Sequence, residues 1–98
     1  MKKIPPFKLV PQPANDEARS LAKFKWAPKD IGTRHQLGGE PSNIQDSFWP
    51  KCSRCRDKMT FYGQLDSIND DICIADCGMI YVFVCLDCLE TAAIVESS

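Results

Sequence analysis

Two pairs of cysteines, each with two residues between its members, place the strongest constraint on how this chain can fold. Cys52 and Cys55 form the first pair and Cys85 and Cys88 the second, with 29 residues between the pairs. A CxxC step lets one tight turn direct two thiolates at one ion, and two such steps supply the four ligands of a tetrahedral zinc site. We therefore predict that these four cysteines bind a structural Zn²⁺.

Six cysteines in 98 residues also allow other chemistry. A secreted chain would join them in disulfides, whereas a reducing cytosol keeps thiols free or metal-bound. A single CxxC step can be a thioredoxin-like redox motif, but that motif opens a helix and the residues after Cys55 have the pattern of a strand. Cys73 and Cys77 lie in an apolar stretch and are interpreted as small core side chains. The alternative that one of them replaces a metal ligand stays open.

Basic side chains surround the first cysteine pair, namely Lys51, Arg54, Arg56 and Lys58. Positive charge near a thiol favours the thiolate that a metal needs. The same side chains, with Trp49 and Phe61 as exposed aromatic residues for base stacking, support an alternative function as a nucleic-acid-binding zinc ribbon. The sequence therefore leaves two kinds of partner open.

Charge is unevenly distributed along the chain. Residues 1–35 hold eight basic and three acidic side chains (+5), and residues 36–98 hold four and ten (−6), for a net charge of −1. A nucleic-acid-binding module normally presents a basic face, so the acidic half argues against nucleic acid as the main partner. It is compatible with a basic protein partner, because complementary potentials favour association.

The sequence predicts a cytosolic protein without a membrane partner. The longest apolar stretch, residues 79–86, is far shorter than the roughly 20 residues that span a bilayer. Four prolines interrupt the first 13 residues, where a signal peptide would need an apolar run.

We expect residues 1–30 to form an extended arm with a short helix. Asn15 is suited to cap that helix, Leu21, Phe24 and Trp26 would supply its apolar side, and Pro28 would end it. The arm would precede a zinc-ribbon-like β domain over residues 31–98.

The second region has the periodicity of strands. Residues 59–68 alternate apolar Met59, Phe61 and Leu65 with polar neighbours, which predicts a half-buried strand. Residues 69–71 predict a turn, and residues 79–85 form a β-branched and aromatic run typical of a buried strand. Residues 89–96 fit either a strand or a helical turn. The predicted fold is mainly β (small α+β), a zinc-ribbon-like antiparallel sheet with a short N-terminal helix or arm.

Three segments together resemble a known family. "HQLGGEPSNIQ" (35–45), "CSRCRDKMTFYGQLDSI" (52–68) and "DCGMIYVFVCLDC" (76–88) follow the order of motifs in the bacterial YwqG-like proteins. The C-terminal domain of programmed cell death protein 2 is more distantly similar. The chain departs from the family in being shorter and in having Asn43 where a Trp is usual.

The resemblance implies a binding role. The family has no established enzyme activity, and some of its members are suspected immunity proteins against toxins. The motif positions that it carries over are Gly38, Gly39, Pro41, Gln45, Gln64, Asp66 and Gly78. We expect a protein–protein interaction module, with a toxin or a nascent protein as examples of a partner.

The residues themselves favour architectural roles at these positions. Gly38 and Gly39 permit a positive-φ turn or a close backbone contact, and Gly78 permits tight entry into the following strand. Gln64 and Asp66 alternate with Leu65, so both could lie on one strand face and hydrogen-bond the loop. His35, the only histidine, lies in a Gly-rich loop without an activated nucleophile and is expected to be structural. We predict that the chain is not an enzyme.

Overall fold

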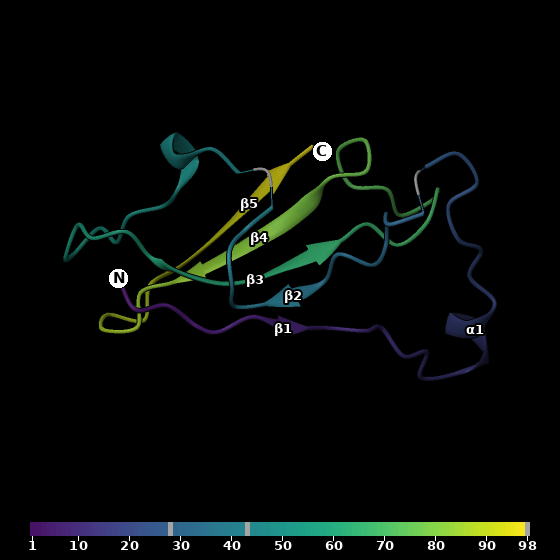
Figure 1. Ribbon diagram of the computed structural model, residues 1–98, viewed down its shortest axis with the longest axis horizontal. Helices are drawn as coiled ribbons and strands as arrows, with labels where there is room; N and C mark the ends of the chain where they lie inside the picture. The colour runs from purple at the N-terminus through teal and green to yellow at the C-terminus, as the bar shows by residue number, and fades with distance from the viewer. Residues whose placement is uncertain (28, 43, 98) are drawn as a thin grey trace.

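One antiparallel sheet organises the part of the chain that the computed structural model describes, residues 1–27, 29–42 and 44–97. Its strands follow the order of the chain, and Figure 1 shows them side by side: β1 (Phe7–Lys8), β2 (Gln36–Leu37), β3 (Thr60–Asp66), β4 (Met79–Val84) and β5 (Thr91–Glu96). The two short helical elements are α1 (Asp16–Arg19) and the 3₁₀ helix η1 (Asp46–Phe48). The predicted mainly-β antiparallel fold is confirmed.

The three longest strands lie where the sequence pattern placed strands. β3 and β4 fall inside the predicted ranges, and the ambiguous residues 89–96 adopt a strand. β5 pairs with β4 over its whole length, from Thr91 opposite Val84 to Glu96 opposite Met79. The predicted turn after β3 is also present, because the Asn69 side chain accepts hydrogen bonds from the N–H groups of Asp71 and Ile72.

A β-bulge in β3 changes which side chains face the core. The pairing with β4 shifts between Phe61 and Gly63, so Tyr62 is an extra residue in the strand. Phe61 and Gln64, three positions apart, both become buried, while Leu65 is 48% exposed. The expected alternation of Met59, Phe61 and Leu65 is therefore wrong for Leu65, because the extra residue reverses the faces after the bulge.

The covered face of the sheet carries the core. Phe61, Tyr81 and Phe83 are each at most 3% exposed. The segment before β3 covers them, with Trp49 in edge contact with Phe83 at 5.2 Å between ring centroids. The indole N–H of Trp49 donates to the Met59 carbonyl at 2.8 Å, which fixes the covering segment against the strand.

The opposite side of the sheet, which we call the open face, is apolar and partly exposed. Its side chains are identified by cross-strand register, since residues directly opposite each other point to the same side. One row consists of Leu65, Ile80 and Val95, and the next of Phe7, Leu37, Gly63, Val82 and Ala93. Phe7 and Val95 are each more than half exposed.

The N-terminal arm holds less helix than the sequence predicts. Asn15 does cap the helix, accepting a hydrogen bond from the Ala18 N–H, but α1 ends at Arg19. Leu21 and Trp26 are exposed, so no apolar helix face is buried, and a helix this short needs such packing. Pro28, its expected end, lies outside the described residues. β1 pairs this arm with β2, and the division at residue 30 stays a prediction.

Candidate metal centre

The two CxxC steps form the same turn twice. In the first, the Cys52 N–H donates to Asp57 O and the Arg56 N–H donates to Cys52 O. In the second, the Cys85 N–H donates to Glu90 O and the Leu89 N–H donates to Cys85 O. Arg56 and Leu89, at equivalent positions, both have φ 63°, the left-handed conformation that reverses the chain.

The sheet brings these two turns to one end of β4. The second turn connects β4 to β5, and the first lies just before β3, the strand that pairs with β4 on its other side. Both loops therefore meet at the left end of the sheet in Figure 1. The four ligand sulfur atoms of Cys52, Cys55, Cys85 and Cys88 all lie within 4.8 Å of one another.

The spacing and the donor set fit a tetrahedral metal. The Sγ atoms of Cys55 and Cys85 are 3.7 Å apart. Four thiolates about 2.3 Å from a central Zn²⁺ would be separated by about 3.8 Å along each edge of the tetrahedron. The part of the chain that the structure describes groups no other cysteine, histidine or carboxylate with these four, so Cys73 and Cys77 are not among the candidate ligands.

The thiols of the cluster ionise unequally. Hydrogen bonds from the backbone N–H groups of Cys55 and Arg54 lower the pKa of Cys52 to about 7. The hydrogen bond to Cys52, together with burial, raises the pKa of Cys88 to about 12. The largest effect on Cys52 thus comes from the backbone of its own turn, whereas the sequence pointed to basic side chains. A cation in the cluster would displace the remaining protons.

A carboxylate joins the two turns independently of any metal. The Glu90 side chain accepts a hydrogen bond from the Ser53 N–H at 2.8 Å and another from the Ser53 hydroxyl. These hydrogen bonds lower the pKa of Glu90. Ser53 lies inside the first CxxC step and Glu90 follows the second, so this contact, which we call the clasp, fixes one step against the other.

No pattern in the sequence predicted the clasp. Ser53 occupies a variable position of the first CxxC step, and Glu90 lies outside the second step. The similarity of the two turns is the only signal that could have suggested it, since it places Glu90 where Asp57 stands in the first turn.

A second polar centre joins β3 to the loop that contains Gly32 and Arg34. The Asp66 side chain is fully buried and pairs with Arg34, whose Nη2 lies 2.7 Å from Oδ1. It also accepts from the backbone N–H groups of Gly32 and Arg34. Burial alone would raise the pKa of Asp66, but the hydrogen bonds from Arg34 and Gly32 outweigh it and the pKa is lowered. We call Arg34, Asp66 and the groups bonded to them the Arg34 network.

Gln64 extends this network on the same strand face. Its amide donates to Arg34 O and to the Ser42 hydroxyl, and its carbonyl accepts from the Ser42 N–H. Asp66 and Gln64 thus hydrogen-bond the loop, the arrangement expected from their alternation with Leu65. His35 has the predicted structural role, because its Nδ1 accepts from the Asp66 N–H at 3.0 Å.

The glycines among the remaining motif positions also have architectural roles. Gly38 and Gly39 have φ values of 65° and 70°, and a Cβ on Gly38 would lie 2.3 Å from Pro5 O. A Cβ on Gly78 would lie 2.0 Å from Glu96 O, so the approach to β5 requires glycine. Pro41 is half-buried and Gln45 is exposed. Asn43 lies outside the described residues.

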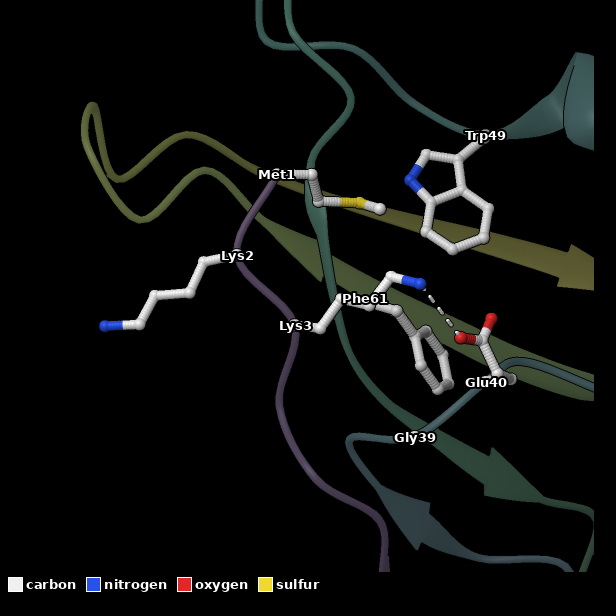
Figure 2. Close-up of a pocket in the computed structure, with 7 residues that line it drawn as sticks. All are labelled: Met1, Lys2, Lys3, Gly39, Glu40, Trp49 and Phe61. Atoms are coloured by element: carbon white, nitrogen blue, oxygen red, sulfur yellow. Dashed lines mark ion pairs between the residues drawn. The ribbon is translucent and has the colours of Figure 1, made fainter.

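A small hollow beside the arm is not a ligand site. Figure 2 shows it between the N-terminal residues and Trp49, with Lys3 directed at Glu40 in an ion pair of 3.5 Å. Its volume of about 10 Å³ has room for about one water molecule. Both charged side chains are about 70% exposed, so the pair is a surface contact.

Comparison with known proteins gives one informative match. Over 62 residues, 61% of this chain, the sequence is 39% identical to the "Uncharacterized protein YpfL" of Salmonella typhimurium (strain LT2). The match spans only 14% of the length of that protein. No protein-family model and no solved structure matches the chain.

Proposed function

We propose that the chain is a small cytosolic zinc module that recognises another protein. The observation that carries this proposal is the convergence of four cysteine sulfur atoms from two equivalent turns. Zinc held by Cys52, Cys55, Cys85 and Cys88 would join the β4–β5 connection to the segment that covers the core. Cys52 and Cys85 already belong to that core, so the metal would extend it where the sheet ends.

The donor set favours a structural role over a catalytic one. A catalytic zinc keeps one coordination position for water or substrate and takes three protein ligands. Four thiolates fill a tetrahedral ion completely. Among the described residues, the other polar clusters serve the backbone, because Asp66, Gln64 and His35 are all engaged by the loop. This supports our prediction that the chain is not an enzyme.

The open face supports protein recognition. Contiguous exposed apolar surface is uncommon on proteins that act alone and often marks an interaction site. Leu65 and Val95, in one row of this face, are 48% and 53% exposed. The resemblance to YwqG-like proteins, with their suspected immunity members, agrees with a binding function and forms part of the proposal. A cytosolic location is also part of the proposal, because free thiols and zinc thiolates are typical of reducing compartments.

Native mass spectrometry tests the metal. The purified chain is measured under native and denaturing conditions, before and after a chelator. We expect the native mass to include one zinc per chain. The chelator should remove this zinc and, with it, the narrow charge-state distribution of a folded protein. A folded protein with six free thiols and no metal would overturn the proposal.

Paired variants test the recognition surface. Leu65→Lys with Val95→Lys places charge on the open face, and Arg54→Ser with Arg56→Asn removes charge from the first turn at exposed positions. Asn tolerates the positive φ of Arg56. In pull-downs that use each variant as bait, we expect the face variant to lose proteins that the wild type and the turn variant retain. Equal capture by all three would count against the open face.

The alternative of nucleic-acid binding rests on the first turn. Lys51, Arg54, Arg56 and Lys58 are all exposed there. The stacking aromatics expected from the sequence are not available, because Phe61 is 3% exposed and Trp49 packs on Phe83. This alternative predicts binding to single-stranded RNA or DNA that weakens steeply with salt and is lost in the turn variant.

A further inference from the structure

We propose that Cys73 and Cys77 form a thiol–disulfide modification site, at which a small-molecule disulfide such as oxidised glutathione converts the pair reversibly into an intrachain disulfide. The site is separate from the four-cysteine cluster. Cys73 and Cys77 precede β4, whereas Cys85 follows this strand. The six residues of β4 span about 20 Å, which separates the two groups of cysteines. The inference does not depend on the identity of the metal.

The two sulfur atoms are already in contact. The Sγ atoms of Cys73 and Cys77 are 3.7 Å apart, and the Cys77 N–H donates to the Cys73 sulfur at 3.0 Å. Cys73 is partly exposed and Cys77 is buried. A reagent in solution can therefore reach one thiol, and the second thiol lies directly behind it.

An unusual turn produces this contact. Ala75, Asp76 and Cys77 have φ values of 45°, 56° and 68°, three successive left-handed residues without a glycine. L-residues adopt this conformation reluctantly, so it persists only where the surroundings impose it. The turn brings the side chains of residues four apart to the same place.

Hydrogen bonds from outside the turn impose its shape. Arg34 Nη2 donates to Cys77 O at 2.6 Å, which joins the turn to the Arg34 network. The Ser67 hydroxyl donates to Gly78 O at 2.8 Å and accepts from the Ile74 N–H at 2.9 Å. Both ends of the turn are thereby tethered, and the two thiols are held near each other in the reduced protein.

The exposures of the two thiols set the order of the steps. Cys73 loses its proton to solvent, and its thiolate attacks one sulfur of the glutathione disulfide. The S–S bond of that reagent breaks, one glutathione leaves and takes up a proton, and Cys73 carries the other glutathione. Cys77 then loses its proton and attacks the Cys73 sulfur, which expels the second glutathione. Two protein thiols are oxidised and one glutathione disulfide is reduced to two glutathiones.

The environment of Cys77 agrees with its role as the second, resolving thiol. Burial, and then the neighbouring Cys73, raise the pKa of Cys77 to about 11. A thiol with a raised pKa is a poor first nucleophile in neutral solution. Excess reduced glutathione reverses these exchange steps and restores both thiols.

Mass mapping of the full chain tests the site. Zinc-loaded protein is equilibrated with oxidised glutathione, and intact masses are followed by peptide mapping without reduction. We expect a loss of about 2 Da, located to one bond between Cys73 and Cys77, with the metal content unchanged and the mass restored by reduced glutathione.

Two variants separate the steps. Cys73→Ser should show neither the mass loss nor an adduct, and Cys77→Ser should keep glutathione on Cys73 because the resolving thiol is missing. Wild-type protein that retains free Cys73 and Cys77, or accumulates a lasting adduct at Cys73, would overturn the proposal. A disulfide that forms among the four cluster cysteines before Cys73 and Cys77 are joined would overturn it as well. The wild-type map decides the question even if Cys77→Ser does not fold.

Discussion

The two ends of β4 are held by different chemistry. After Val84, four sulfur atoms from two loops converge on a space that suits one metal ion. Before Met79, the Arg34 network joins a loop to the sheet by hydrogen bonds and one buried ion pair. The first arrangement would be completed by a metal ion from solution, and the second is complete in the chain itself. We therefore expect metal, thiol reagents and pH to act on the two ends separately.

The largest expected effect is the loss of the metal. Removing zinc with a chelator, or replacing Cys52 with Ser, should abolish cooperative unfolding, since structural zinc sites in small domains contribute an apparent ~10–16 kcal/mol. Circular dichroism and metal analysis on the same samples measure this. Cys73→Ser is the matched control, because it removes a thiol outside the cluster. A Cys52→Ser protein with wild-type thermal stability would refute a structural metal.

Breaking the ion pair at the other end should cost less. Asp66→Asn leaves the Arg34 guanidinium without its buried partner, and the loss of one member of such a pair typically costs about 3–5 kcal/mol. Urea unfolding of zinc-loaded protein measures the change. We expect the metal content of the folded variant to stay at one zinc per chain, which distinguishes the two ends. Asp70→Asn, at an exposed turn position, should be close to neutral.

The clasp should affect the metal more than the fold. Groups that hold metal ligands from outside typically change metal affinity by about 10–100-fold when removed. Glu90→Ala should therefore weaken zinc in competition with a chromophoric chelator. Glu90→Gln can still hydrogen-bond Ser53 and should lose less, and Ser53→Ala should fall between them because the Ser53 N–H remains. A wild-type zinc affinity in all three variants would mean that the two turns alone determine the geometry of the cluster.

The smallest effect is the response of the Arg34 network to acid. Because the pKa of Asp66 is lowered in the folded protein, its contribution to stability is complete above its unfolded pKa of about 3.9. That contribution is lost as the pH falls through the lower, folded value. Acid also protonates the cysteine ligands and weakens zinc binding in both proteins alike, so the prediction concerns the difference between wild type and Asp66→Asn at each pH. That difference in stability should shrink as the pH falls from roughly 5 to 2, the range in which this titration falls. Parallel curves would contradict the role of Asp66.

Spacing and periodicity predicted the local features well. The CxxC steps predicted the cysteine cluster because a short turn leaves little freedom to two thiols, and the β-branched run predicted β4. The exposure of Leu65 could not be predicted in the same way, since one extra residue at Tyr62 reverses the strand faces and leaves no compositional mark. Arg34 was missed because its partners are separated from it by more than 30 residues. The short N-terminal helix and its Asn15 cap are present, but the helix ends earlier than predicted since a cap alone does not supply packing.

The edges of the sheet differ as much as the ends of β4. β1 is two residues long and lies between prolines at positions 5, 6 and 11, which protects that edge because proline has no N–H to offer a neighbouring strand. β5 has six residues, TAAIVE, and pairs with β4 on one side only. An edge of this kind is a template for strand addition. Self-association of concentrated protein should therefore start at β5, and a charged or proline substitution there is the natural way to keep the chain monomeric in solution.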